Sequence, residues 1–185
     1  FIKIRNAFDK SEGGGILIQD RKEDNSNGIV IFNYNLIEDV GNKKMSVFGI
    51  KKYYNFNFDY NTVRNCFIND YSCQINLANN KVFGLEYTLT GHSLINCESQ
   101  CQNGGGFGLW LVFPNNPQDI KTGKFNLQNC LFERNKCAIS TDNPGNNKGY
   151  GGAYEPGFSS TCNTEIYISN TTFIGNEAAK AGGAL

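Results

Sequence analysis

Apolar and polar residues alternate in short runs along this chain, which is the pattern of β-strands. The stretch from Tyr54 to Tyr60 has an aromatic residue at every second position, and the stretch from Phe83 to Leu89 alternates in the same way. We expect the aromatic residues of the first run, including Phe58 and Tyr60, to face the protein core. The pattern therefore predicts an all-β chain of many short strands.

One alternating pattern recurs six times. An aliphatic residue stands two positions before an Asn in each case, and the successive Asn residues are 27, 32, 31, 33 and 41 positions apart. Such a recurrence predicts stacked coils in which equivalent side chains lie above one another. We expect the six to form one hydrogen-bonded asparagine ladder: Asn6, Asn33, Asn65, Asn96, Asn129 and Asn170.

Each Asn is followed by a bulky residue, and then often by a glycine pair and another apolar run. Three short strands in each turn of roughly 30 residues are typical of a parallel β-helix. A leucine-rich repeat is the competing solenoid, but its Asn lies three residues after the last leucine rather than two. We therefore predict a single parallel β-helix module over residues 1–185, with about six coils.

Two segments carry a family resemblance. Phe132-x-x-Asn135 with Gly151-Gly152-Ala153, and Phe173-x-x-Asn176 with Gly182-Gly183-Ala184-Leu185, resemble the FxxN and GGA[IL] repeats of bacterial polymorphic outer membrane proteins. Large β-helix surface proteins of ciliated protists are similar, with closer Asn and Cys usage. The resemblance implies a right-handed, pectate-lyase-like β-helix in a cell-surface or secreted protein, with adhesive or scaffolding roles.

Charge and hydropathy restrict the expected partners. The chain has 17 basic and 17 acidic residues and no basic excess, which disfavours nucleic acid as a partner. It has no run of 18 apolar residues, so we expect no direct membrane insertion by this segment. Because both ends fall inside a repeat, we expect a fragment flanked by more coils of a longer chain or by neighbouring protein chains, with glycans as a further candidate.

The seven cysteines and single histidine contain no C-x-x-C pair, which argues against a zinc site and leaves no cofactor or metal expected. Three of the cysteines directly follow a ladder Asn, so we expect them in one column, and each has a companion downstream. Disulfides within a coil, disulfides between stacked coils, and a buried apolar column of thiols all remain open, with Cys162 left over. The six candidates are Cys66, Cys73, Cys97, Cys101, Cys130 and Cys137.

Many β-helices are polysaccharide lyases or hydrolases, which need clustered carboxylates on an outward face. The positions expected to face outward contain no Asp or Glu. They are Lys3, Val30, Thr62, Ser93, Asn126 and Tyr167, and Arg5, Phe32, Arg64, Ile95, Gln128 and Ser169. We therefore expect no catalytic residues, and we interpret His92 as a core histidine that is hydrogen-bonded to Asn61.

The stretch from Ile139 to Thr164 is the longest insertion, and loops that project from a solenoid often carry binding residues. Tyr150, Tyr154 and Phe158 in this insertion form the expected contact loop. The sequence thus predicts a non-catalytic extracellular or cell-surface module that acts as scaffold, filament subunit or adhesin. The alternative is a carbohydrate-active β-helix whose catalytic residues lie in loops or outside the fragment.

Overall fold

The protein is all-β in the part that the structure describes. This computed structural model describes residues 2–5, 8–9, 16–19, 29–42, 48–51, 55–68, 75–79, 85–100, 107–111, 121–139, 151–158 and 162–184. These residues form β-strands joined by turns and contain no helix. Among them, accordingly, no helix is long and apolar enough to span a lipid bilayer.

The strands form five sheets, named here A to E. Sheet A holds β1 (Lys3–Arg5), β5 (Leu36–Glu38), β9 (Thr62–Arg64), β13 (Ser93–Ile95), β17 (Leu131–Glu133) and β21 (Thr172–Ile174). Sheet B holds β2 (Phe8–Asp9), β6 (Gly41–Asn42), β10 (Phe67–Ile68), β14 (Glu98–Gln100), β18 (Lys136–Ala138) and β22 (Glu177–Ala178).

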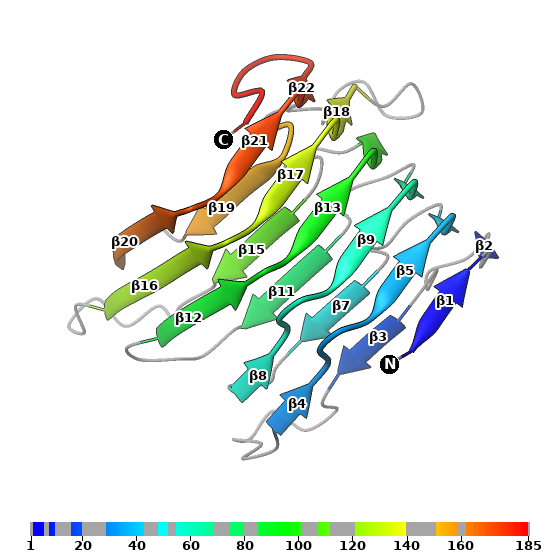
Figure 1. Ribbon diagram of the computed structural model, residues 1–185. Helices are drawn as coiled ribbons and strands as arrows, with labels where there is room; N and C mark the ends of the chain where they lie inside the picture. Colours follow the sequence, from blue (N-terminus) through cyan, green and yellow to red (C-terminus); the bar gives the residue numbers. More distant parts are fainter. Residues whose placement is uncertain are drawn as a thin grey trace.

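Sheet C holds β3 (Ile16–Gln19), β7 (Phe48–Lys51), β11 (Ile75–Asn79), β15 (Phe107–Leu111) and β19 (Tyr154–Phe158). Sheet D pairs β4 (Ile29–Ile31) with β8 (Asn55–Asn57). Sheet E holds β12 (Leu85–Thr90), β16 (Lys121–Gln128) and β20 (Cys162–Ser169). In Figure 1 the strands of sheet C lie behind those of sheet A and run in the opposite direction.

Every strand pairing in these sheets is parallel, and neighbours within a sheet come from successive passes of the chain. We use the word rung for the stretch between one visit to sheet A and the next. The rungs are in register, so that Val63 of β9 pairs with Ile37 below and with Leu94 above. The predictions of an all-β chain and of parallel pairing between distant segments are therefore confirmed.

In each rung the chain turns at two corners, one just before its strand in sheet A and one just after it. At each corner one residue per rung has a positive φ, the left-handed conformation that turns the chain sharply. The first corner precedes sheet A and contains Tyr34, Tyr60, Gly91, Asn129 and Asn170, with φ between 46° and 62°. The second corner follows sheet A and contains Asp39, Asn65, Asn96, Arg134 and Gly175, with φ between 51° and 59°.

Large apolar side chains fill the interior beside these corners. The residue two positions before each left-handed residue faces inward, and most of these side chains are fully buried. Beside the second corner they are Ile37, Val63, Leu94 and Phe132; beside the first they are Phe32, Phe58, Leu89 and Leu127. Burying such residues is the main favourable term in folding.

Tyr60 is an exception to the expected aromatic core. Phe58 is fully buried as predicted, but Tyr60 is 46% exposed. Because Tyr60 occupies the left-handed corner position, its side chain turns outward and stacks on Tyr34, with ring centroids 4.9 Å apart. The strict alternation of the sequence run is broken by the corner.

The glycine pairs of the last two rungs lie directly on one another. The amide of Gly151 donates to the carbonyl of Ala181, and that of Gly152 donates to the carbonyl of Gly182. A Cβ atom at Gly152 would stand 2.3 Å from the carbonyl oxygen of Gly183 and 2.5 Å from that of Glu177. The second glycine therefore allows a backbone contact that no side chain permits.

We predict that Gly152→Ala lowers the free energy of unfolding by at least about 3 kcal/mol, because backbone atoms block the new methyl group. Gly175→Ala is the matched control. A Cβ at Gly175 meets only the Arg134 side chain, at 3.5 Å, so its cost of about 1 kcal/mol comes from the left-handed backbone alone. Denaturant titration of both variants measures the difference, and equal losses would contradict this account.

Candidate functional site

Two columns of inward-facing side chains follow the two corners. The residue directly after each left-handed residue points back into the molecule, and its equivalents stack from rung to rung. Column 1, after the first corner, contains Asn35, Asn61, His92, Cys130 and Thr171. Column 2, after the second corner, contains Val40, Cys66, Cys97, Asn135 and Asn176.

Asparagines in these columns join one rung to the next. In column 1, Asn61 accepts hydrogen bonds from the backbone amide of Asn35 (2.9 Å) and from its side chain (3.1 Å), and donates to the carbonyl of Phe32 (2.6 Å). In column 2, Asn176 accepts the equivalent bonds from Asn135 (2.9 and 3.0 Å) and donates to the carbonyl of Phe132 (2.9 Å). The side chain thus satisfies backbone groups at the corner.

The same local sequence produces both pairs. Each of these asparagines lies three residues after an inward-facing Phe, in the FxxN segments Phe32 to Asn35, Phe58 to Asn61, Phe132 to Asn135 and Phe173 to Asn176. The Phe rings of paired segments stack as well, Phe32 on Phe58 at 5.6 Å and Phe132 on Phe173 at 5.0 Å. Recognising FxxN in all four places, rather than two, would have identified these columns from the sequence.

The single predicted asparagine ladder is wrong in its register. Asn65 and Asn96 lie together at the second corner, where the Asn96 amide donates to Asn65 at 3.0 Å. Asn129 and Asn170 lie together at the first corner, joined at 2.6 Å. Asn33 precedes its corner and instead accepts from the amide of Asp59 at 2.7 Å, while Asn6 lies outside the described residues. Both corners have an apolar residue two positions before a residue with positive φ. The repeat alone therefore does not distinguish the two corners, and the predicted ladder combined residues from both.

The disulfide prediction also needs correction. Cys66, Cys97, Cys130 and Cys137 are buried thiols that are not joined in disulfides. Three of these thiols donate to backbone carbonyls: Cys66 donates to Arg64 at 3.2 Å, Cys97 to Ile95 at 3.4 Å and Cys130 to Gln128 at 3.3 Å. Thr171 makes the equivalent bond to Ser169 at 3.0 Å, so cysteine here takes the place of a small hydrogen-bond donor.

The expected cysteine column is therefore only partly present. Cys66 and Cys97 are neighbours in column 2, but Cys130 lies in column 1, and Cys137 lies beyond the second corner beside Ser99 in sheet B. Cys73 and Cys101 lie outside the described residues, and Cys162 begins β20. The prediction that Cys66, Cys97 and Cys130 share one column is wrong for the same reason as the ladder.

His92 is a fully buried core residue, as predicted, but its expected hydrogen bond to Asn61 is not formed. The Asn61 side chain bonds to the rung below instead, and the His92 ring lies 5.3 Å from that of Phe58. Burial lowers the pKa of His92 to about 3, since the charged imidazolium would lose its hydration. The residue is thus neutral at ordinary pH.

A buried carboxylate that the sequence reasoning missed lies on the outer side of sheet A. Glu38 is 2% exposed, and its carboxylate contacts Lys3 Nζ at 2.8 Å, Arg64 Nε at 2.8 Å and Arg5 Nε at 3.4 Å. The hydrogen bonds from Lys3 and then from Arg64 lower the pKa of Glu38 to about 2. Its basic neighbours come from the rungs directly below and above, so the cluster binds three rungs together.

The expectation that outward positions lack acidic residues is wrong in consequence. The outward column of sheet A reads Arg5, Glu38, Arg64, Ile95, Glu133 and Ile174. The sequence register had placed Phe32 and Gln128 in this column, because it aligned residues from the two different corners. With the correct register, the alternation of Arg5, Glu38 and Arg64 along the column becomes visible.

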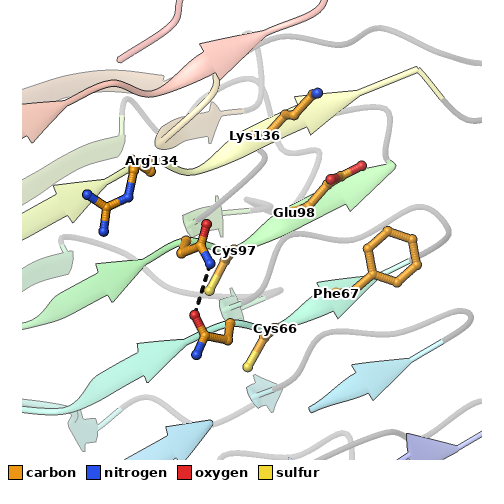
Figure 2. Close-up of a pocket in the computed structure, with 8 residues that line it drawn as sticks. Cys66, Phe67, Cys97, Glu98, Arg134 and Lys136 are labelled. Carbon is orange, nitrogen blue, oxygen red and sulfur yellow. Dashed lines mark hydrogen bonds between the residues drawn. The ribbon is translucent and has the colours of Figure 1, made fainter. Parts of the chain in front are cut away.

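A groove of about 330 Å³ lies along the second corner, beside the corner residues Asn65 and Asn96 and the column 2 residues Cys66 and Cys97. Figure 2 shows Cys66 and Cys97 on adjacent rungs, with Arg134 and Lys136 on the rung above. The lining residues are Asn65, Cys66, Phe67, Asn96, Cys97, Glu98, Arg134 and Lys136. Burial raises the pKa of Cys97, and a hydrogen bond from its thiol, which is shared with the carbonyl of Ile95, lowers the pKa of Cys66.

The expected contact loop is partly a strand. Tyr154 and Phe158 begin and end β19, which pairs with β15 along its whole length, and Tyr150 lies outside the described residues. β19 ends the order of sheet C, and an edge strand tolerates Pro156, which has no amide to donate. Phe107 and Leu111 of β15 fix the register of the two ends.

Comparison with protein-family models, curated proteins and solved structures gives no match to this chain. Within the described ranges, no group of three or more His, Cys, Asp or Glu side chains is placed to hold a metal ion. The candidate site is therefore defined by its own geometry: two hydrogen-bonded columns, a buried ion cluster and the groove at the second corner.

We predict that Asn135→Ala lowers the free energy of unfolding by about 2 to 5 kcal/mol, because the carbonyl of Leu94 and the amide of Cys97 lose a buried partner. Asn170→Gly is the control. It removes only the exposed bond to Asn129 and keeps a residue suited to positive φ, so the expected change is no more than about 1 kcal/mol. Denaturant unfolding measures both, and an inert Asn135→Ala would refute the role of column 2.

We predict that the protein loses stability as the pH falls below 6.5. The unfolded chain then protonates His92, whereas the folded chain, with a pKa near 3, does not. The free energy of unfolding is expected to fall by about 2 kcal/mol between pH 7.5 and pH 5. Most carboxyl groups titrate below this pH interval and so contribute little to the change. His92→Asn, which copies Asn61 one rung below, should remove most of this dependence. An unchanged pH profile in that variant would exclude His92 as its origin.

Proposed function

We propose that the chain is a right-handed parallel β-helix that serves as a non-catalytic structural or adhesive module, outside the cell or at its surface. The cyclic order in which the chain visits its parallel sheets supports winding of this kind. The in-register contact of Gly151-Gly152 with Gly182-Gly183 and the four FxxN segments support the same repeat.

The observation that carries the structural role is the use of the buried polar groups. The side chains of Asn61, Asn176 and Glu38 make their hydrogen bonds and ion pairs to adjacent rungs. A buried group committed to rung-to-rung contacts adds rigidity along the stack and has no bonding capacity left for a substrate. A stiff support for exposed surfaces is the function that such an arrangement serves best.

A carbohydrate-active enzyme would instead need two accessible carboxylates at a defined separation. Glu38 and Glu133 share the outward column of sheet A, but two rungs lie between them, which separates them by roughly 14 Å at the ordinary strand spacing. Two glycosidase carboxyls stand only about 5 to 9.5 Å apart. Glu38 is also buried under three basic residues, so this pair does not favour the catalytic alternative.

The proposed location rests on the repeat resemblance, because the buried thiols withdraw the support that disulfides would have given it. Further coils of a longer chain, neighbouring protein chains and glycans are the proposed partners. Ile166 and Ile168 of the last rung are exposed, although their strand partners Phe125 and Leu127 in the rung below are fully buried, and a further coil would cover them.

Two assays on the purified chain test this function. In the first, beads coated with the chain are expected to adhere to cell surfaces or to immobilised glycans more than beads coated with Gly152→Ala, in which the contact between the last two rungs is disturbed. In the second, a panel of plant, algal and bacterial polysaccharides is incubated with the chain, and new reducing ends and unsaturated products are measured. We expect adhesion without turnover. Turnover that is abolished in Glu133→Gln would establish an enzyme instead.

A further inference from the structure

Cys66 and Cys97 form a pair of thiols stacked one rung apart. Both are in column 2 and almost completely buried, with 2% and 1% of their surfaces exposed. The backbone amide of Glu98 donates to the carbonyl of Cys66, which fixes the register of the two rungs at this point. Figure 2 shows the two sulfur atoms on the same side of their strands, beside the groove at the second corner.

The strand spacing decides what can join these sulfurs. Equivalent atoms of in-register parallel strands lie about 4.8 Å apart. A disulfide needs a sulfur–sulfur distance of about 2.05 Å and Cβ atoms about 3.5 to 4.5 Å apart, which is slightly closer than the strand spacing. A thiolate–metal bond is about 2.3 Å long, taking zinc as a guide, and two such bonds in line span about 4.6 Å. The spacing therefore matches an ion held between the two sulfurs.

We propose that Cys66 and Cys97 form a two-coordinate binding site for a soft monovalent cation, Cu(I), at the base of this groove. Soft thiolate ligands select Cu(I), and a d10 ion of this class accepts a linear pair of ligands. Zinc, by contrast, requires four ligands in structural sites, and among the described residues no group of three or more His, Cys, Asp or Glu side chains is placed to hold an ion.

The binding step conserves atoms and charge without any redox change. Two S–H bonds break, two protons go to solvent and two S–Cu bonds form, while copper remains Cu(I). The product carries one net negative charge. Arg134 and Lys136 line the same groove and offset this charge, although they also contact Glu133 and Glu177. Because protons compete for the buried sulfurs, binding strengthens as the pH rises.

The groove gives the ion a route to the sulfurs, and burial protects it afterwards. The volume of about 330 Å³ admits a small copper complex, which can transfer its ion to the thiols. Few water molecules reach either sulfur once the ion is bound, since both side chains are covered by neighbouring rungs. Because little water reaches the sulfurs, water molecules and dissolved ligands compete poorly with them for Cu(I).

The experiment is an anaerobic titration of the purified chain with Cu(I) against a chromophoric Cu(I) chelator. Cys73, Cys101 and Cys162 are first replaced by Ser, so that these thiols do not contribute. We expect one Cu(I) per chain, and an X-ray absorption spectrum with two sulfur ligands and no nitrogen or oxygen ligand. Cys66→Val should weaken binding at least 100-fold, by roughly the upper end of the loss seen for mutations in the outer shell of metal sites.

Two variants separate loss of a ligand from loss of the fold. Cys66→Val copies Val40, the column 2 residue one rung below, and so is expected to fold. Cys130→Thr copies Thr171, the next residue of column 1, and should bind Cu(I) as tightly as the parent chain. Unchanged binding by Cys66→Val, equal weakening in both variants, or a third sulfur ligand would each overturn the proposed site.

Discussion

The fold depends on how the backbone is satisfied at its two corners. A residue with positive φ turns the chain between strands, and the turn leaves an amide and a carbonyl that the strand ladders cannot pair. Asn61 and Asn176 supply the missing donor and acceptor from the adjacent rung, as described for columns 1 and 2. Without Asn61 and Asn176, the corners of the rungs below them would bury an unpaired amide and an unpaired carbonyl, and the apolar residues beside those corners could not pack without that penalty.

The strand pattern was predictable from the sequence, and the register was not. An apolar residue two positions before a residue that tolerates positive φ is a property of both corners, as Leu94 before Asn96 and Leu127 before Asn129 illustrate. A periodicity of about 30 residues cannot distinguish the two corners, since they are only five residues apart. The FxxN segments do carry the information, because the buried Asn lies one residue after the corner. The side chains at Tyr34 and Arg134 hid the corners, since neither residue type is expected at positive φ.

The errors about chemistry follow from that register. Glu38 was missed because its basic neighbours Arg5 and Arg64 become adjacent only when the second corner is aligned with itself. The spacing of the cysteines indicates proximity, which is compatible with disulfides, but it carries no information on the hydrogen bonds that the thiols make. In the structure, thiol, hydroxyl and amide side chains perform one task at equivalent positions, donating to a carbonyl near the corner. At these positions a small side chain that can donate a hydrogen bond to the corner carbonyl is thus sufficient, whichever of the three chemical types it is.

The two corners are always five residues apart, as in Tyr34 with Asp39 and Asn170 with Gly175, whereas equivalent residues of successive rungs are separated by 26, 31, 38 and 41 positions. All variation in rung length therefore falls outside the segment that carries both columns. Insertions can lengthen the perimeter without disturbing the stacking of one layer on the next. The molecule is for that reason a natural frame for displaying grafted peptides, in which the foreign segment enters between β18 and β19 or between β15 and β16 and leaves the invariant five-residue segment untouched.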